Sequence, residues 1–420
     1  MKEILRQVIF EQRERSARPT GTAFPEIPRK LPQALMDCPE ILIISGIRRC
    51  GKSTLLRQIR ESRQERDFYL NFDDERLINF TVEDFQILHE VFIELFGEQH
   101  TFYFDEIQNV AGWERFVRRL ADAGAKIFIT GSNASMLSRE LGTHLTGRFV
   151  RHELYPFSFG EFLRFRGNYP ADSDFFTTSG RAKLSAEVQA YLRLGGFPQY
   201  IAGENDDYLK ALYEGIVYRD VLVRNRFMGE RELRELGYFL ASNAAKRFSY
   251  VSATKAVGLK HSETAKNYIA ALENSYLVSQ VVKFDYSAKK QIANEKKIYF
   301  ADPALIRKIG FNPTENTGPI FENVVYTELR RRGCDIFYHA GKKECDFVLR
   351  GARGIEAAIQ ACATMRATET REREIAGLLD ALDTYDLATG TIVTLDEAGE
   401  FSRAGKRIFV RPLAEWLLGK

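Results

Sequence analysis

The feature that most constrains this chain is a glycine-rich loop between a buried strand and a helix. An apolar run at residues 41–44 precedes the loop, and a helical segment follows it. The loop matches the pattern G-x-x-x-x-G-K-S over Gly46, Ile47, Arg48, Arg49, Cys50, Gly51, Lys52 and Ser53. Its glycines let backbone N–H groups converge on a phosphate, and the helix start adds a positive dipole end. The sequence therefore predicts a binding loop for a nucleoside triphosphate.

The residue types in this loop predict how the triphosphate is held. Lys52 is expected to reach the β- and γ-phosphates, and the Ser53 hydroxyl is expected to hold Mg²⁺. Thr54 continues the loop into the helix and belongs to the expected binding site. Cys50 is interpreted as a small residue that the loop tolerates.

Two adjacent acids follow a second apolar strand, expected at residues 101–104. A carboxylate at the C-terminal tip of such a strand can approach Mg²⁺, which is the role expected of Asp105. Glu106 points differently and is expected to polarise the attacking water, as phosphoryl transfer requires. A strand that ends in solvated acids is the alternative for this segment alone. After a phosphate loop, the catalytic interpretation is favoured.

Small polar residues follow a third buried strand, expected at residues 126–129. From this position Thr130 or Ser132 can sense the γ-phosphate. A plain turn at the end of a strand explains both residues almost as well.

An arginine precedes a further apolar strand near residue 149. Arg148 can project into the nucleotide of a neighbouring subunit, where such a finger contributes roughly 10³–10⁵ in rate. A surface arginine is the alternative. Arg139 is a weaker candidate for the same role.

Other motifs occur together and in order along the chain. They are residues 71–77 (NFDDERL), 130–132 (TGS), 154–159 (LYPFSF), 195–198 (GGFP), 273–277 (ENSYL), 321–323 (FEN) and 344–347 (ECDF). With them the chain resembles prokaryotic AAA-type ATPases that carry a C-terminal domain of unknown function. The resemblance implies a homo-oligomeric ATPase, with a hexamer as one form, that acts on nucleic acid. It also favours ATP with Mg²⁺, and no N-K-x-D guanine reader is evident.

Composition limits the other classes of protein. The chain has 420 residues, with 60 Lys+Arg against 57 Asp+Glu, so it is nearly neutral. DNA binding would therefore have to come from local patches. The five cysteines show neither a C-x-x-C pair nor zinc spacing, which favours a reducing cytoplasm. No apolar run reaches the length of a membrane helix.

The expected fold class is α/β with several domains. We expect an N-terminal amphipathic helix and lead-in at residues 1–40, a P-loop AAA+ core at 41–155, a helical lid at 156–230, a winged helix at 231–300 and a restriction-endonuclease-like domain at 301–420. In the lid, Arg193 and Arg219 are candidates for a phosphate contact, but both can equally form salt bridges.

The expected winged helix has three helices followed by two strands. Ser252 is expected to cap the second helix and Ser262 the third, and the strands are expected to join in a basic hairpin. DNA contacts are expected from the third helix and from the hairpin, through Lys260, His261, Lys266, Asn267, Lys289, Lys290 and Lys296. A purely structural role or a subunit contact is the alternative.

The last domain alternates helix and strand in an order that resembles a nuclease core. In such a core, an aspartate and a later acid-x-lysine hold a metal beside the scissile phosphate. Asp346 fills the first position, whereas Gln360 and Cys362 fall where the acid and lysine are expected. An amide and a thiol cannot replace those charges, and Glu356 would face a different level of the sheet. We therefore expect a DNA-binding or assembly module without cleavage activity.

Three functions follow from these patterns. The first is a cytoplasmic, oligomeric ATPase that remodels or moves along DNA, whether single-stranded, duplex or branched. The second is a nucleotide-switched regulator or sensor with slow turnover and a protein partner. The third, and least favoured, is an ATP-dependent nuclease. Comparing basal with DNA-stimulated phosphate release separates the first two.

Overall fold

The structure is a computed structural model that describes residues 1–17, 25–134, 145, 147–225, 227, 229–311 and 317–420. Within it, the chain divides into two compact units. Unit 1 comprises Met1–Leu154 and Asn274–Tyr276, and unit 2 comprises Tyr155–Glu273 and Leu277–Lys420. Arg139 lies outside the described residues.

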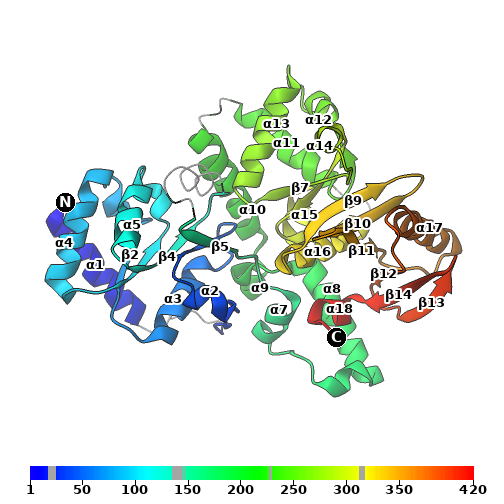
Figure 1. Cartoon of the computed structure of the whole chain (residues 1–420), viewed down its shortest axis with the longest axis horizontal. Coiled ribbons are helices and arrows are strands. Elements are labelled where there is room, and N and C mark those ends of the chain that lie inside the picture. The colour runs from blue at the N-terminus through cyan, green and yellow to red at the C-terminus, as the bar shows by residue number, and fades with distance from the viewer. Residues whose placement is uncertain (18–24, 135–144, 146, 226, 228, 312–316) are drawn as a thin grey trace. The chain divides into compact units, whose positions relative to one another are not determined.

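Unit 1 is an α/β layer structure built on a parallel sheet (Figure 1). Its elements are α1 (Lys2–Ala17), α2 (Gln33–Asp37), β1 (Ile41–Ser45), α3 (Lys52–Arg63), β2 (Phe68–Asn71), η1 (Glu75–Leu77), η2 (Val82–Asp84), α4 (Phe85–Phe96), β3 (Thr101–Asp105), η3 (Ile107–Asn109), α5 (Trp113–Asp122), β4 (Lys126–Gly131) and β5 (Phe149–Glu153). The five strands run parallel in the order β2-β3-β4-β1-β5.

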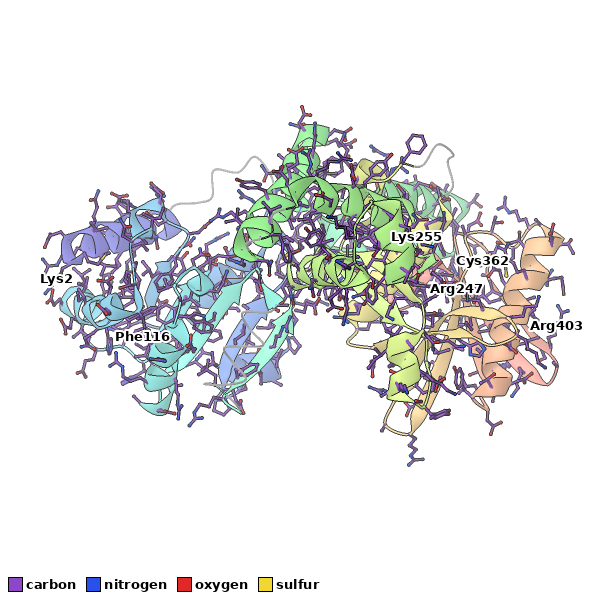
Figure 2. All side chains as sticks on the ribbon, turned by 90° about the horizontal axis from the view of Figure 1, so that it is seen from above. Lys2, Phe116, Arg247, Lys255, Cys362 and Arg403 are labelled. Atoms are coloured by element: carbon purple, nitrogen blue, oxygen red, sulfur yellow. The ribbon has the colours of Figure 1, made fainter. Side chains whose placement is uncertain are left out.

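The two faces of this sheet are covered by different helices. All five residues of β1 are buried, and alternate residues point to opposite faces. Ile41 and Ile43 join a core with α1, α4 and α5, to which Phe116 also belongs (Figure 2). The other face is packed by α3. The N-terminal helix α1 is thus part of the core of unit 1, because Leu5, Val8 and Ile9 are buried in it.

Unit 2 contains the remaining elements. They are α7 (Phe159–Phe165), η4 (Asp172–Phe175), α8 (Thr178–Leu194), α9 (Pro198–Gly203), α10 (Asp206–Gly215), the π-helix η5 (Ile216–Val223), α11 (Glu230–Ser242), β6 (Arg247–Phe248), α12 (Tyr250–Ala256), α13 (Ser262–Asn274), β7 (Val278–Val282), α14 (Ala288–Ala293), β8 (Lys296–Phe300), α15 (Pro303–Ile309), α16 (Gly318–Arg331), β9 (Asp335–Ala340), β10 (Glu344–Gly351), β11 (Gly354–Ala361), α17 (Thr368–Thr384), β12 (Thr389–Thr394), β13 (Gly399–Arg403), β14 (Lys406–Pro412) and α18 (Leu413–Leu418).

Three helices and a small sheet occupy residues 230–300. The helices α11, α12 and α13 are followed by an antiparallel sheet in the order β6-β8-β7. Ser249 caps α12 with its hydroxyl, so the expected cap at Ser252 is wrong by one turn. The expected hairpin tip is also wrong, because α14 lies between the two strands. Lys296 is buried in β8 and is not part of an exposed tip.

The C-terminal sheet has six strands in the order β13-β14-β12-β11-β10-β9. The strands β9, β10 and β11 form an antiparallel meander, and β12 then pairs in parallel with β11. Helix α17 makes the crossover and packs on β10, β11 and β12. Its Ile375, Leu378 and Leu382 are buried in the core of this sheet.

No helix in the described ranges is both long enough and apolar enough to span a bilayer.

Candidate nucleotide site

The glycine-rich loop joins β1 to α3 and depends on both of its glycines. A Cβ atom on Gly46 would lie 2.1 Å from the Leu154 carbonyl oxygen, and Gly46 has φ of 149°. Gly51 has φ of 105° at the residue where α3 begins. Side chains rarely adopt this backbone region, so neither position accepts another residue without strain. The loop predicted from the sequence is therefore in place at a strand-to-helix junction.

Lys52 is a buried lysine with weak partners. Its side chain is 4% exposed, and Nζ donates to the carbonyl oxygens of Gly46 and Ile47 at 3.2 Å each. The nearest carboxylate oxygen is Oε1 of Glu106, at 3.6 Å. Such a cation is held by dipoles and one distant charge. It can therefore turn to a more strongly charged ligand, such as a triphosphate.

Asp105 ends β3 and is fully buried. The Thr130 hydroxyl donates to its Oδ1, whereas its buried Oδ2 has no hydrogen-bond partner among the described residues. Burial, followed by the charge of Glu106, raises the pKa of Asp105 to about 6. A buried carboxylate oxygen without a donor is costly unless a cation or donor completes it.

Glu106 follows in a left-handed backbone conformation, with φ of 53°. This conformation is unfavourable for a residue with a side chain and is held by the surrounding contacts. Its Oε2 accepts hydrogen bonds from Gln108 and, at 3.0 Å, from the Ser132 hydroxyl. Burial raises the pKa of Glu106, but the Lys52 charge and these hydrogen bonds outweigh burial and lower it. Glu106 is therefore ionised at neutral pH, as a group that orients water must be.

The two small polar residues after β4 contact the acids directly. Besides bonding to Asp105, Thr130 Oγ1 accepts a hydrogen bond of 3.0 Å from the backbone N–H of Glu106. Ser132 bonds to the Glu106 carboxylate. The structure thus gives Thr130 a positioning contact with both acids, in a place where the sequence alone suggested a phosphate sensor or a turn.

The residues present fit a magnesium–triphosphate complex. Ser53 is exposed at the start of α3, and its hydroxyl favours the charged form of Asp105, so the two groups are neighbours. A hydroxyl and a carboxylate are hard oxygen ligands of the kind that Mg²⁺ takes when it also binds substrate phosphates. The orphaned Asp105 oxygen is the observation that supports this fit.

Arg148 lies at the opposite edge of the sheet from the loop. Its neighbour Phe149 pairs with Ile41 at the beginning of β1, whereas the loop follows the end of that strand. Five strand residues span roughly 16 Å. Arg148 Nε donates to Asp122 at 2.9 Å, and the side chain is 41% exposed. Arg148 therefore does not act on the loop of its own chain, and a role in a neighbouring subunit stays a prediction.

Two residues at the site were missed by the sequence interpretation. Gln108 holds the Glu106 carboxylate and stands two residues after it, so the spacing was a usable signal. Arg29 Nη1 donates to the carbonyl oxygen of Cys50 at 2.8 Å, from a lead-in segment that carries no motif. Only the fold brings Arg29 to the loop.

Six of the seven residues expected to contact DNA are exposed on unit 2, whereas Lys296 is buried in β8. Exposed side chains lie before and along α13 and on α14: Lys260, His261, Lys266, Asn267, Lys289 and Lys290. Lys266 shares its charge with Glu263 at 3.7 Å, whereas Lys289 and Lys290 form no ion pair with a described residue. In the expected lid, Arg193 forms an ion pair with Glu204 at 2.8 Å.

The nuclease-like positions of the C-terminal sheet are occupied by side chains with structural partners. Gln360 Oε1 accepts from the backbone N–H of Asp346 at 3.2 Å, and its Nε2 donates to Glu374. The Cys362 thiol donates to the Thr364 carbonyl at 3.1 Å. Neither residue is available to a substrate phosphate.

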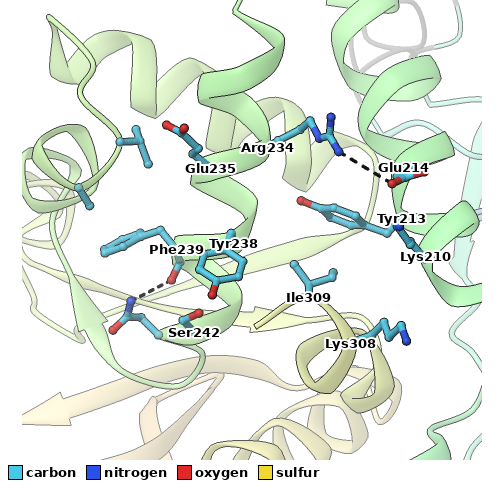
Figure 3. Close-up of a pocket in the computed structure, with 13 residues that line it drawn as sticks. Lys210, Tyr213, Glu214, Arg234, Glu235, Tyr238, Phe239, Ser242, Lys308 and Ile309 are labelled. Carbon is cyan, nitrogen blue, oxygen red and sulfur yellow. Dashed lines mark hydrogen bonds and ion pairs between the residues drawn. The ribbon is translucent and has the colours of Figure 1, made fainter. Parts of the chain in front are cut away.

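A separate pocket of about 700 Å³ lies in unit 2, bordered by α10, α11, α12 and α15 (Figure 3). Tyr213, Tyr238 and Phe239 give it an aromatic lining. Two of its cations have acidic neighbours, because Arg234 lies 3.9 Å from Glu214 and Lys308 lies 2.8 Å from Asp206. No sequence motif indicates this pocket.

Comparison with known proteins agrees with the geometry of unit 1. Residues 39–163 match a family described as AAA domain, and residues 185–315 match a domain of unknown function. An uncharacterized protein of Methanocaldococcus jannaschii is 35% identical over 350 residues, which cover 80% of this chain and 77% of that protein. An uncharacterized protein of Haemophilus influenzae is 33% identical over 337 residues, covering 75% of this chain and 81% of that protein.

Solved structures are similar only at a low level. The RuvB Holliday junction branch migration motor of Thermotoga maritima shares 13% identity, with 70% of this chain and 94% of that chain covered and a TM-score of 0.29. A score this low supports no conclusion about the present chain.

The loop, the two acids and the parallel sheet define a nucleotide-binding domain of the AAA type. The chain belongs to the family of AAA-type ATPases that carry an additional domain of unknown function, together with the archaeal and Haemophilus relatives.

Proposed function

We propose that this chain hydrolyses ATP at the site formed by Lys52, Ser53, Asp105 and Glu106. One observation carries the proposal: a buried lysine and an ionised glutamate lie 3.6 Å apart beside a buried aspartate with an orphaned oxygen. Loop N–H groups and Lys52 would bind the phosphates, with Gly46 to Thr54 forming the cradle. Mg²⁺, held by Ser53 and Asp105, would supply charge neutralisation at the phosphates.

Phosphate binding and the orientation of water fall to side chains of the chain itself. Lys52 turns from its two carbonyl partners to the phosphates, which leaves Glu106 without its closest cation. Glu106 then orients a water molecule, and Ser132 and Gln108 fix the direction of its carboxylate. Because charge stabilisation in a dry site supplies most of the rate, removing one such group should cost about 10²–10³.

Two measurements on the purified chain test the proposed activity. ATP turnover with Mg²⁺ should be present in the wild type and lost in Glu106→Gln, while ATP binding is kept. If the wild type neither binds nor hydrolyses ATP, the assignment is wrong.

The proposed target of this activity is DNA, and the proposed assembly is a homo-oligomer in which Arg148 reaches a neighbouring site. The order of α11, α12, α13 and the sheet β6-β8-β7 supports a winged helix in unit 2. The exposed cations of α13 and α14 support phosphate contact by this module. Phosphate contacts weaken as salt rises, so affinity should fall steeply between low and moderate salt.

ATP turnover across single-stranded, duplex and branched DNA separates this role from a nucleotide-switched regulator. Stimulation that disappears in Lys289→Glu/Lys290→Glu, with the basal rate kept, supports a DNA role. Turnover that ignores all three DNA forms supports a regulator with a protein partner.

A further inference from the structure

Three carboxylates of unit 2 converge on one buried ammonium. Lys297 Nζ lies 3.0 Å from Glu322 Oε1, 2.8 Å from Glu344 Oε1 and 2.9 Å from Asp346 Oδ1. The lysine belongs to β8 of the three-stranded sheet. Its partners belong to α16 and to β10 of the six-stranded sheet. The ion pairs of Lys297 therefore connect the three-stranded sheet to α16 and to the six-stranded sheet.

The ammonium is enclosed, and its surroundings are strongly acidic. The Lys297 side chain is 2% exposed, whereas those of Asp346 and Glu322 are 10% and 14% exposed. Burial lowers the pKa of Lys297, but Asp346 and Glu322 outweigh burial and raise it well above 10.5. Burial and the charge of Asp346 raise the pKa of Glu322. The lysine therefore stays charged, and one carboxyl of the cluster takes up a proton readily.

Further contacts fix the carboxylates around the ammonium. The second oxygen of Asp346 accepts from the backbone N–H of Ala361 at 3.1 Å, and Glu322 Oε1 accepts from the Tyr299 hydroxyl at 2.6 Å. Glu344 also pairs, at 3.1 Å, with Arg247 of β6. Each of the three carboxylates thus has a partner besides the ammonium.

Carboxylate oxygens that converge from several elements make the ligand set of a hard divalent cation. As they stand, the described residues hold no group of three or more His, Cys, Asp or Glu side chains able to bind a metal ion. We propose that Lys297 is the built-in cation of this carboxylate site: its ammonium occupies the place of a divalent metal and locks β8 to α16 and β10. The site is consequently structural and independent of metal, and its position excludes substrate from Asp346.

The neighbouring Lys296 provides a matched control. It lies on the same strand and is 7% exposed, and its Nζ donates to the carbonyl oxygens of Ile292 and Asn294. Its removal leaves neutral carbonyl groups, whereas removal of Lys297 leaves one buried carboxylate, Asp346, and two partly buried ones, Glu322 and Glu344. Lys296→Met and Lys297→Met therefore differ mainly in whether carbonyl groups or carboxylates lose their cation.

The test is thermal unfolding of the full chain without nucleotide, in EDTA and in 1 mM Mn²⁺. We expect Lys297→Met to lose roughly 10 °C in Tm in EDTA, since a largely buried charge network loses its central cation. Mn²⁺ should restore most of that loss, and Mn²⁺ electron paramagnetic resonance should show one additional bound ion. Wild type and Lys296→Met should show no Mn²⁺-dependent gain.

Several outcomes would overturn the proposal. They are a Lys297→Met chain as stable as the wild type in EDTA, a loss that Mn²⁺ does not restore, or an equal restoration of Lys296→Met. Repeating each arm in an Asp105→Asn background removes the metal ligand of the phosphate loop. No arm contains ATP, so failure of the proposed ATPase activity leaves this test unaffected.

A second variant covers the case in which Lys297→Met does not fold. Lys297→Met/Glu344→Gln carries one negative charge fewer and should fold in EDTA. Mn²⁺ should raise the Tm of this double variant by less than it raises the Tm of Lys297→Met refolded with Mn²⁺, because one carboxylate ligand is gone. A double variant that also fails to fold at pH 5, where its acids can take up protons, would contradict a purely electrostatic role for Lys297.

Discussion

The two units each contain a buried lysine beside acids, but the two lysines are held in opposite ways. Lys52 has two carbonyl partners and one carboxylate at 3.6 Å. Lys297 has three carboxylates within 3.0 Å. An ammonium with weak partners can bind a new anion, whereas one surrounded by acids cannot. Burial of a lysine therefore does not by itself identify a binding site. The number and distance of the carboxylates around the ammonium decide whether it can bind another anion.

The acids differ in the same sense. Asp105 has an orphaned oxygen in unit 1, which leaves room for a cation. Both oxygens of Asp346 are engaged in unit 2, one by Lys297 and one by Ala361. The site in unit 1 thus has a carboxylate oxygen with no hydrogen-bond partner among the described residues. In unit 2 the chain itself completes the site.

The same substitution made at each of the two lysines should give the largest difference in turnover and Tm. Lys52→Met should lower ATP turnover by about 10³, because it removes a phosphate ligand. It should lower Tm less than Lys297→Met does, because two carbonyls and only one carboxylate, at 3.6 Å, lose their cation. Lys297→Met should lower Tm and leave the turnover of the folded protein within about twofold. Phosphate release and thermal melts on both variants measure this. Full turnover in Lys52→Met would remove the basis of the comparison.

Glu106→Gln tests whether the acid of unit 1 is catalytic. The amide keeps the size of the side chain and can still contact Ser132, but it cannot carry the charge that orients water. Turnover should fall by about 10²–10³, while ATP affinity is kept. Phosphate release under saturating ATP, with equilibrium binding in parallel, checks this. Loss of affinity equal to the loss of turnover would instead indicate a binding role.

Ser132→Ala should have a smaller effect in unit 1. The serine donates one of the hydrogen bonds that fix the Glu106 carboxylate, and Gln108 still donates the other. We expect kcat to fall about tenfold with KM nearly constant, since one hydrogen bond to a charged group is worth roughly 1.5 kcal/mol. Ser62→Ala, at a partly buried hydroxyl that donates to the Ile59 carbonyl far along α3, is the control. A rise in KM without a change in kcat would show that Ser132 binds substrate.

The nucleotide site could be predicted from the sequence because its parts are local. The loop from Gly46 to Ser53 follows β1, and Asp105 and Glu106 stand at the end of β3. Both strands are buried throughout, and parallel strands bring their C-terminal ends to one edge. That edge includes β1 and β3 with β4 between them. Local pattern and sheet topology were therefore sufficient to bring the loop and the two acids together, but not to find Arg29.

The site in unit 2 could not be predicted in this way. Lys297 and Asp346 are 49 residues apart, and a lysine in a strand ordinarily suggests an exposed edge. The predicted hairpin tip between β7 and β8 was wrong for a related reason. Residues 288–293 contain Ala, Lys and Gln, which favour a helix, but their basic character suggested a turn at the surface. Tertiary partners, not local preference, decide where these lysines lie.

The pH dependence of stability should show the smallest effect and sharpens the comparison in unit 2. Burial and Asp346 raise the pKa of Glu322 above its ordinary 4.5, so the folded chain binds a proton that the unfolded chain has released. The resulting stability is fully present below pH 4.5 and is lost as the pH rises through the raised pKa. Glu322→Gln retains an oxygen acceptor for Lys297 and removes the titration. It should therefore reduce the fall in unfolding free energy between pH 5 and 9 by about 1 kcal/mol. Urea denaturation at both pH values measures this difference. If Glu322→Gln leaves the change in unfolding free energy with pH unaltered, Glu322 keeps its charge in the folded chain and Lys297 alone balances all three acids.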